Sequence, residues 1–239
     1  MHRFIGLSLV LLAVACSEGD DAEAPSREIM CIDQSIASLM LFDQPAGDAI
    51  LEDAAQGDHF ETLIDATGGG FEPSTSFIYV RFTRDGIEQV AISDEDSFDS
   101  NEWHLALRRY VLRVNSGVAG PADVSVARTA PMTEFAALES APDDLAYRTE
   151  AYFTEDCDLI PDGSGLGAPG TALASFWSYA GCVAMTGNVY VLDLGGGDAV
   201  KLEVLAYYPP DIQQTCQQTD AVPMPSGAGN VRIRWAFLD

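Results

Sequence analysis

The feature that most constrains the fold is a pair of alternating segments near the C-terminus, joined by a short glycine loop. Residues 188–194 (NVYVLDL) and 199–208 (AVKLEVLAYY) flank the loop 195–198 (GGGD). Alternate positions of the second segment are apolar and polar, with Val200, Leu202 and Val204 set against Lys201 and Glu203. Because side chains alternate between the two faces of a strand, this pattern predicts an antiparallel hairpin with one buried face.

The same alternation recurs along much of the chain. Residues 76–83 (SFIYVRFT) and 87–93 (IEQVAIS) alternate around an Asp85-Gly86 turn, and 59–66 (HFETLIDA) ends at three glycines. In 231–238 (VRIRWAFL) the inward positions are Val231, Ile233, Trp235 and Phe237, and the outward ones are Arg232 and Arg234. These segments predict an all-β fold of mostly antiparallel sheets, with at most short helices.

The remaining segments are less regular. Residues 29–42 fit either a strand or a short helix, and 47–57 (GDAILEDAAQG) favours a helix. Residues 142–187 and 209–229 are rich in Pro, Gly and Asp and predict long loops. The acidic segment 94–102 predicts a solvated loop, since it lacks the spacing of a calcium-binding loop.

The N-terminus has the pattern of a targeting segment. A short basic start precedes the apolar run 4–14 (FIGLSLVLLAV), which is too short to span a membrane, and small residues lead to Cys16. This resembles a bacterial lipoprotein signal, in which the cysteine is lipidated; the alternative is an ordinary signal cleaved nearby. We therefore expect a signal peptide over 1–15, an acidic tether over 16–28 and one β-rich domain over 29–239. Because Ser17 follows the cysteine, the resemblance favours the outer membrane or cell surface.

Charge and cysteine content exclude several classes of protein. The 37 acidic and 12 basic residues give a net charge of −25, which excludes a nucleic-acid partner. Four cysteines follow Cys16, and an even number in an oxidising compartment predicts two disulfides among Cys31, Cys157, Cys182 and Cys216. Four cysteines can form two disulfides in three ways, and the sequence does not choose among them. The wide spacing argues against a zinc site.

Catalytic signatures are missing, so we expect a protein that is not an enzyme. After the signal, His59 and His104 are the available histidines, and no Gly-x-Ser-x-Gly elbow occurs. Residues 165–170 match the motif G-x-G-x-x-G. Because Pro161, Asp162 and Gly163 precede them, they predict a loop rather than a dinucleotide-binding site. A hydrolase using carboxylates alone is the weakest alternative.

The stretch 100–117 (SNEWHLALRRYVLRVNSG) breaks its own alternation in the middle. One extra residue at Arg108-Arg109 restores it, with Leu105, Leu107, Tyr110, Leu112 and Val114 on one face and His104, Ala106, Arg108, Val111 and Arg113 on the other. Such a phase shift predicts a β-bulge within one strand, and bulges often reorient side chains near a site.

This stretch resembles the Trp-Asp-Ile-Ala-Phe…Arg-x-Asn-Gly/Ser-Gly region of the HmuY family of bacterial haem-binding lipoproteins. Residues 62–67 with 77–86, the hairpin 187–208 and the segment 231–238 are similar to further strands of that family, in the same order. The resemblance covers about residues 58–238. It implies an almost all-β fold, capture of haem or another porphyrin outside the cell, and delivery to an outer-membrane transporter.

The resemblance also implies site residues. Haem iron takes His or Met axial ligands, and the available pair is His104, which stands where the family has Asp, with Met132. Cationic partners for the propionates are Arg81, Arg84, Arg108, Arg109 and Arg113. The alternative is a surface interaction lipoprotein that kept the fold and binds no haem. Dimerisation, disulfide pairing and the transporter are left open.

Overall fold

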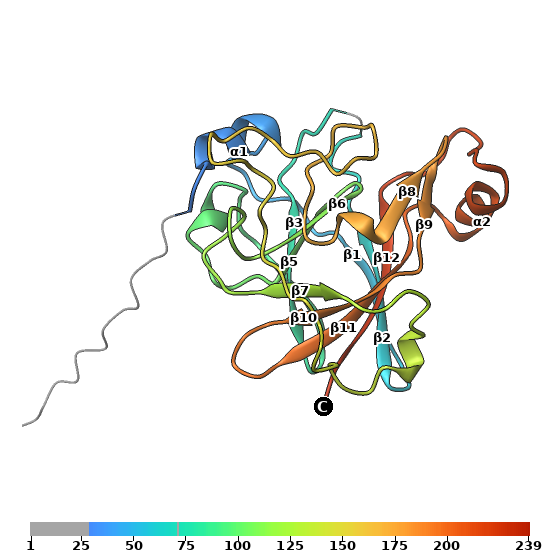
Figure 1. The fold of residues 1–239 in the computed structure, drawn as a ribbon. Helices are drawn as coiled ribbons and strands as arrows, with labels where there is room; N and C mark the ends of the chain where they lie inside the picture. The colour runs from blue at the N-terminus through green and yellow to red at the C-terminus, as the bar shows by residue number, and fades with distance from the viewer. Residues whose placement is uncertain (1–28, 71) are drawn as a thin grey trace, which may run out of the picture.

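A six-stranded antiparallel sheet forms one layer of the protein in the computed structural model, which describes residues 29–70 and 72–239 (Figure 1). The predicted signal peptide, Cys16 and the tether lie outside the described residues. The spatial order of the strands is β1-β2-β12-β11-β10-β7. Their bounds are Ile50–Gln56 (β1), His59–Asp65 (β2), Asn230–Phe237 (β12), Ala199–Ala206 (β11), Val189–Asp193 (β10) and Ser125–Arg128 (β7).

A four-stranded antiparallel sheet, in the order β4-β3-β5-β6, forms the second layer. Its strands are Gly86–Val90 (β4), Ile78–Thr83 (β3), Leu105–Arg108 (β5) and Val111–Val114 (β6). A two-stranded ribbon stands apart from both sheets, made of Trp177–Tyr179 (β8) and Val183–Met185 (β9). The helical elements are α1 (Ile32–Ser38), α2 (Pro210–Thr219) and the 3₁₀ turns η1 (Asp96–Phe98), η2 (Phe135–Ala137) and η3 (Ala174–Phe176). The predicted all-β class is confirmed.

Apolar side chains fill the space between the two sheets and also cover their outer faces. Val80 and Leu105 from the four-stranded sheet pack into one cluster with Ile64 and Trp235 from the six-stranded sheet. A second cluster behind the four-stranded sheet contains Phe77, Tyr79, Trp103 and Tyr152. Both sheets are therefore internal layers, which accounts for apolar residues on both faces of several strands. Within the described residues, no helix is long and apolar enough to cross a membrane.

The predicted β10–β11 hairpin is present, but its second face is not solvated. Lys201 is buried, and its Nζ donates to the carbonyls of Phe135 at 3.1 Å and Leu138 at 2.9 Å. Phe135 and Leu138 form a third cluster with Val189 and Val191, so the segment that carries η2 lies over this sheet. The expectation of one buried face was therefore wrong, because a distant segment covers the other face.

Residues 50–56, for which the sequence favoured a helix, form the edge strand β1. They pair with β2 across the turn at Gly57, whose φ is 72°. The carboxylate of Asp53 accepts from Thr62 Oγ1 at 2.6 Å and from the amide of Ile87 at 2.8 Å. Strand pairing and these side-chain bonds override the helix propensity of alanine, glutamate and glutamine.

The two predicted long loops contain short elements. Segment 142–187 includes β8 and β9, and segment 209–229 includes α2. The Cys182–Cys216 disulfide joins β9 to α2, and Gln213 of α2 donates to Val183 O at 3.1 Å. A helix of mostly polar residues thus keeps its place through tertiary bonds that its sequence does not indicate.

The phase break in 100–117 is a hairpin turn and not the predicted bulge. Arg108 pairs with Val111 and Leu107 with Leu112, so Arg109 and Tyr110 form a two-residue turn in which Arg109 has φ 53°. Residues facing each other across an antiparallel pair share a face. The predicted sorting to two faces is therefore correct for the paired residues 105–108 and 111–114, although its cause is a reversal of the chain. His104 is an exception, because its ring stacks on Phe82 of the cluster between the sheets, whereas Ala106 lies in the cluster behind the four-stranded sheet.

Segment 94–102 is only in part the solvated loop that its acidity predicted, with Glu95, Asp96, Asp99, Asn101 and Glu102 exposed. Asp94 and Phe98 are buried, and Trp103 Nε1 donates to the carbonyl of Ser97 at 3.1 Å. The indole covers this segment from the side of the four-stranded sheet.

The two disulfides, Cys31–Cys157 and Cys182–Cys216, span 126 and 34 residues of sequence. Loop-closure entropy predicts that replacing Cys31 and Cys157 by serine lowers the free energy of unfolding by about 5 kcal/mol, against about 4 kcal/mol for the Cys182 and Cys216 pair. Urea unfolding of both double variants measures the two losses. A larger loss for the shorter loop contradicts loop entropy as the source of stabilisation.

Candidate functional site

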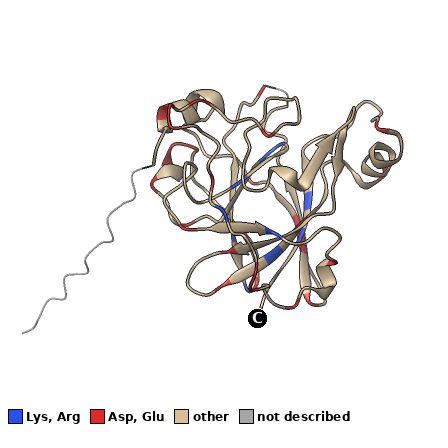
Figure 2. Cartoon of the chain, viewed as in Figure 1, with Lys and Arg blue, Asp and Glu red and all other residues tan. Residues whose placement is uncertain are grey.

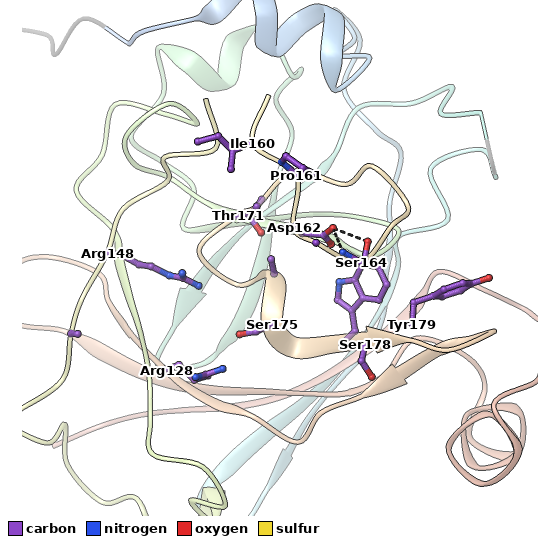
Figure 3. Close-up of a pocket in the computed structure, with 15 residues that line it drawn as sticks. Arg128, Arg148, Ile160, Pro161, Asp162, Ser164, Thr171, Ser175, Ser178 and Tyr179 are labelled. Carbon is purple, nitrogen blue, oxygen red and sulfur yellow. Dashed lines mark hydrogen bonds between the residues drawn. The ribbon is translucent and has the colours of Figure 1, made fainter. Parts of the chain in front are cut away.

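A cavity of about 930 Å³ opens where β7, β8 and the loops between residues 146 and 175 meet (Figure 3). Arg128 ends β7, and the backbone of Arg148 bonds to Val126 in both directions at 2.9 Å. Because Arg128 lies two residues after Val126, the two arginine side chains leave the same face. Figure 3 shows both guanidinium groups directed into the cavity from one side.

Figure 2 marks the Lys and Arg residues of the chain in blue. The two cavity arginines differ from Arg81, Arg84 and Arg234 in their ion pairs. Arg81 and Arg84 each contact a carboxylate at 2.6 Å, and Arg234 contacts Glu203 at 2.6 Å. Within residues 29–70 and 72–239, neither Arg128 nor Arg148 forms an ion pair. In a chain with 37 acidic residues, two cations at one cavity without carboxylate partners make a local site for an anion.

The rest of the lining combines aromatic and hydroxyl side chains. Trp177 packs against Tyr110 with ring centroids 4.9 Å apart, which fixes the indole at the base of the ribbon. Tyr179 and Ile160 are 45% and 41% exposed and leave apolar surface at the cavity. Further lining residues are Asp162, Ser164, Thr171, Ser175 and Ser178. The Asp162 carboxylate accepts from the amide and the hydroxyl of Ser164 at 2.9 and 2.7 Å.

One wall of the cavity is held by bonds to Ala172, which follows the lining residue Thr171. The amide of Ala172 donates to Glu150 Oε2 at 2.9 Å, and Arg148 Nη2 donates to the carbonyl of Ala172. Glu150 Oε1 accepts from the amide of Val114 at 2.9 Å. The Glu150 carboxylate therefore ties the cavity wall to strand β6.

Glu150 is fully buried, and its acid–base behaviour follows from that position. Burial raises the pKa of its carboxyl to about 7, against the opposing effect of the amides of Val114 and Ala172 and of the charges on Arg113 and Arg148. The buried Tyr152 also faces it. Because the folded-state pKa lies above the unfolded value, ionisation of Glu150 opposes folding.

We predict that Glu150 makes the protein less stable as the pH rises from about 4.5 to about 7. Protonation is favoured in the folded state, so this destabilisation is absent below the unfolded pKa and complete above the folded one, with a slope of at most about 1.4 kcal/mol per pH unit. Urea unfolding at several pH values, with wild type compared to Glu150→Gln, measures it. Parallel curves for the two proteins across this window contradict the prediction.

Arg108 and Arg113, both predicted for the propionates, lie in a buried network behind the four-stranded sheet. Arg108 Nη1 lies 3.4 Å from Asp94 Oδ2 and donates to the carbonyls of Met40 and Thr75 at 3.0 and 3.2 Å. Arg113 is fully buried and donates to the hydroxyl of Tyr79. Burial lowers the pKa of Arg108 to about 10, opposed by the Asp94 charge.

This network gives a stability prediction. Replacing Arg108 by alanine leaves the fully buried Asp94 without its cation and should lower the free energy of unfolding by about 3 kcal/mol, since breaking a buried pair costs this much. Arg81→Ala is the matched control, because its exposed pair with Glu88 contributes less than about 1 kcal/mol. Denaturant unfolding of both variants tests the difference; equal losses contradict it.

His104, predicted as an iron ligand, lies beside β3 and is half-buried. Its Nδ1 accepts from the amide of Phe82 at 3.2 Å, and its ring stacks on that of Phe82 at 6.1 Å between centroids. Burial, followed by the charge on Arg81, lowers its pKa to about 4, so it is neutral at pH 7. It does not line the cavity.

The other predicted residues are dispersed over the molecule. Met132 is 96% exposed in the loop before η2, and no contact joins it to His104 among the described residues. Arg109 stands at the β5–β6 turn, 5.7 Å over the Tyr110 ring, and Arg84 pairs with Asp198. The structure thus does not bring the predicted residues to one place, and their binding roles stay predictions.

Sequence reasoning missed Arg128 and Arg148. Arg148 falls in a segment predicted as loop, and Arg128 ends a four-residue strand without a marked pattern. No shared local signal marked the pair, because Arg128 has no acidic residue within four positions whereas Glu150 stands two residues after Arg148. Their proximity comes from a pairing of residues 126 and 148 that is not local in sequence.

Comparisons with known proteins find similar solved structures only. No family model matches the chain, and no curated protein does. Similar solved structures include a candidate HmuY-like heme-binding protein of Bacteroides vulgatus, with 17% identity, 79% of this chain and 97% of that chain covered, and TM-score 0.49. An HmuY analog of Tannerella forsythia has 15% identity, with 80% of this chain and 100% of that chain covered, and a TM-score of 0.44. PinO of Porphyromonas gingivitis has 16% identity, with 78% of this chain and 99% of that chain covered, and a TM-score of 0.42. At such low identities and TM-scores, the likeness establishes neither family membership nor function.

Proposed function

We propose that this protein is an exported lipoprotein that binds haem or another porphyrin in the cavity lined by Arg128 and Arg148. The observation that carries this proposal is the pair of guanidinium groups directed into one cavity without carboxylate partners among the described residues. Porphyrins such as haem carry two carboxylates on a flat apolar ring, and arginine matches carboxylates by its planar donors.

The acidity of the chain limits which arginines can bind an anionic ligand. A net charge of −25 repels an anionic ligand at long range. Local cations must therefore overcome that repulsion at the point of binding, and Arg128 and Arg148 are available to do so, whereas Arg81, Arg84 and Arg234 are already paired.

The size and lining of the cavity suit a ring of this type. Its volume of about 930 Å³ lies within the range of small-molecule and cofactor sites, about 300–1,000 Å³. Trp177, Tyr179 and Ile160 supply apolar and aromatic surface for the ring, and the hydroxyls of Thr171 and Ser175 supply polar partners near the arginines.

Location and delivery belong to the same proposal and rest on the sequence. Lipid attachment at Cys16 would hold the protein at the outer membrane or cell surface, and hand-over of the ligand to an outer-membrane transporter would complete the task. The second candidate, a surface interaction lipoprotein without a cofactor, is favoured by the dispersed positions of His104 and Met132.

We predict that Arg128→Ala weakens binding of protoporphyrin IX at least tenfold. A hydrogen bond to a charged group contributes about 1.5–3 kcal/mol, and each 1.4 kcal/mol is tenfold in affinity. Quenching of tryptophan fluorescence in the full chain, with Cys16→Ser in every sample to block lipidation, gives the dissociation constants.

Arg84→Ala is the matched control, because it removes an equal charge from a surface pair with Asp198 away from the cavity. It should change the affinity less than about threefold, which corresponds to under 1 kcal/mol. Equal losses in the two variants, or no binding of haemin or protoporphyrin at micromolar concentrations, overturn the proposed site and favour the second candidate.

A further inference from the structure

We infer that this cavity recognises the carboxylates of a porphyrin and not its central metal. The inference rests on the proposed function and deepens it, because it defines the ligand class as porphyrins with free carboxylates, whether or not they hold iron. It follows from where the structure places the donors able to ligate iron and where it places the cations.

The lone pairs of His104 are committed within the fold. A backbone amide can only donate, so the bond from Phe82 N at 3.2 Å makes Nδ1 an acceptor and places the proton of the neutral ring on Nε2. Ligation through Nδ1 would leave the Phe82 amide without that bond, and ligation through Nε2 would require loss or transfer of the proton.

The other histidine, methionine and cysteine side chains lie outside the lining of the cavity. His59 bonds through Nδ1 to Asp58 at 3.0 Å and contacts Phe135 edge-on. Met132 is 96% exposed, outside the lining. The four cysteines of the described chain form two disulfides. The 15 lining residues therefore contain no histidine, methionine or cysteine. Their one tyrosine, Tyr179, could ligate iron through its hydroxyl, but Figure 3 shows that hydroxyl directed away from Arg128 and Arg148.

The cavity does hold groups that select carboxylates. Arg128 and Arg148 leave one face side by side, and Thr171 and Ser175 place hydroxyls in the same lining. Arg148 also bonds to the carbonyl of Ala172, which fixes the position of its guanidinium before a ligand arrives. Esterification of a carboxylate removes its charge and should therefore weaken binding more than removal of iron.

The test compares four ligands on the full chain with Cys16→Ser: haemin, protoporphyrin IX, zinc protoporphyrin IX and protoporphyrin IX dimethyl ester. We expect dissociation constants within about threefold for the first three and at least tenfold weaker binding of the ester. Tryptophan quenching reports all four ligands alike. The Soret band of haemin should not change in His104→Ala or Met132→Ala.

Each other result has a definite meaning. If haemin binds at least tenfold more tightly than protoporphyrin IX, the inference is overturned while porphyrin binding stands, and loss of that difference with a shifted Soret band in His104→Ala, Met132→Ala or Tyr179→Phe identifies the iron ligand. If the ester binds as tightly as the free acid, recognition by carboxylates is overturned. If none of the four binds, the proposed function fails and the inference with it. Arg84→Ala serves as the charge control throughout.

Discussion

The buried carboxylate of Glu150 connects the framework of the molecule to its cavity. It accepts the amide of Val114, at the end of the four-stranded sheet, and the amide of Ala172, in the cavity wall, each at 2.9 Å. Two residues earlier, Arg148 bonds to the carbonyl of the same Ala172. Glu150 and the guanidinium of Arg148 thus bind the same residue beside the cavity, and burial of the Glu150 carboxylate is costly enough to raise its pKa to about 7.

The arginines also differ in their partners, according to where each lies in the fold. Arg108 and Arg113 lie behind the four-stranded sheet, where Asp94 and Tyr79 satisfy part of their bonding and hold segments 39–42 and 94–98 to the strands. The surface arginines pair with the many carboxylates. Arg128 and Arg148 remain at the cavity, and this allocation, more than the number of cations, explains how so acidic a chain can offer a site for an anion.

Several elements were predictable because their cause is local. Alternation in 199–206 and 230–237 predicts the strands, and an even cysteine count predicts two disulfides, although not the pairings Cys31–Cys157 and Cys182–Cys216. Other elements have distant causes. Lys201 is buried because residues 135–138 cover its face, and β1 forms because Thr62 and Ile87 bind Asp53. Candidate site residues chosen by resemblance, such as His104 and Met132, were dispersed because resemblance gives positions along the chain and not in space.

The stretch 100–117 shows the difference between what the sequence and what the tertiary structure determine. By itself the sequence determined the two faces of residues 105–108 and 111–114, because alternation with one phase shift assigns each of these side chains to a face. Only the tertiary structure decided that the shift is a turn at Arg109-Tyr110, because a bulge and a two-residue reversal leave the same pattern in sequence and differ in which strands pair. The cavity was likewise decided by the tertiary structure, since its arginines meet through the pairing of residues 126 and 148, which depends on the packing of the whole sheet.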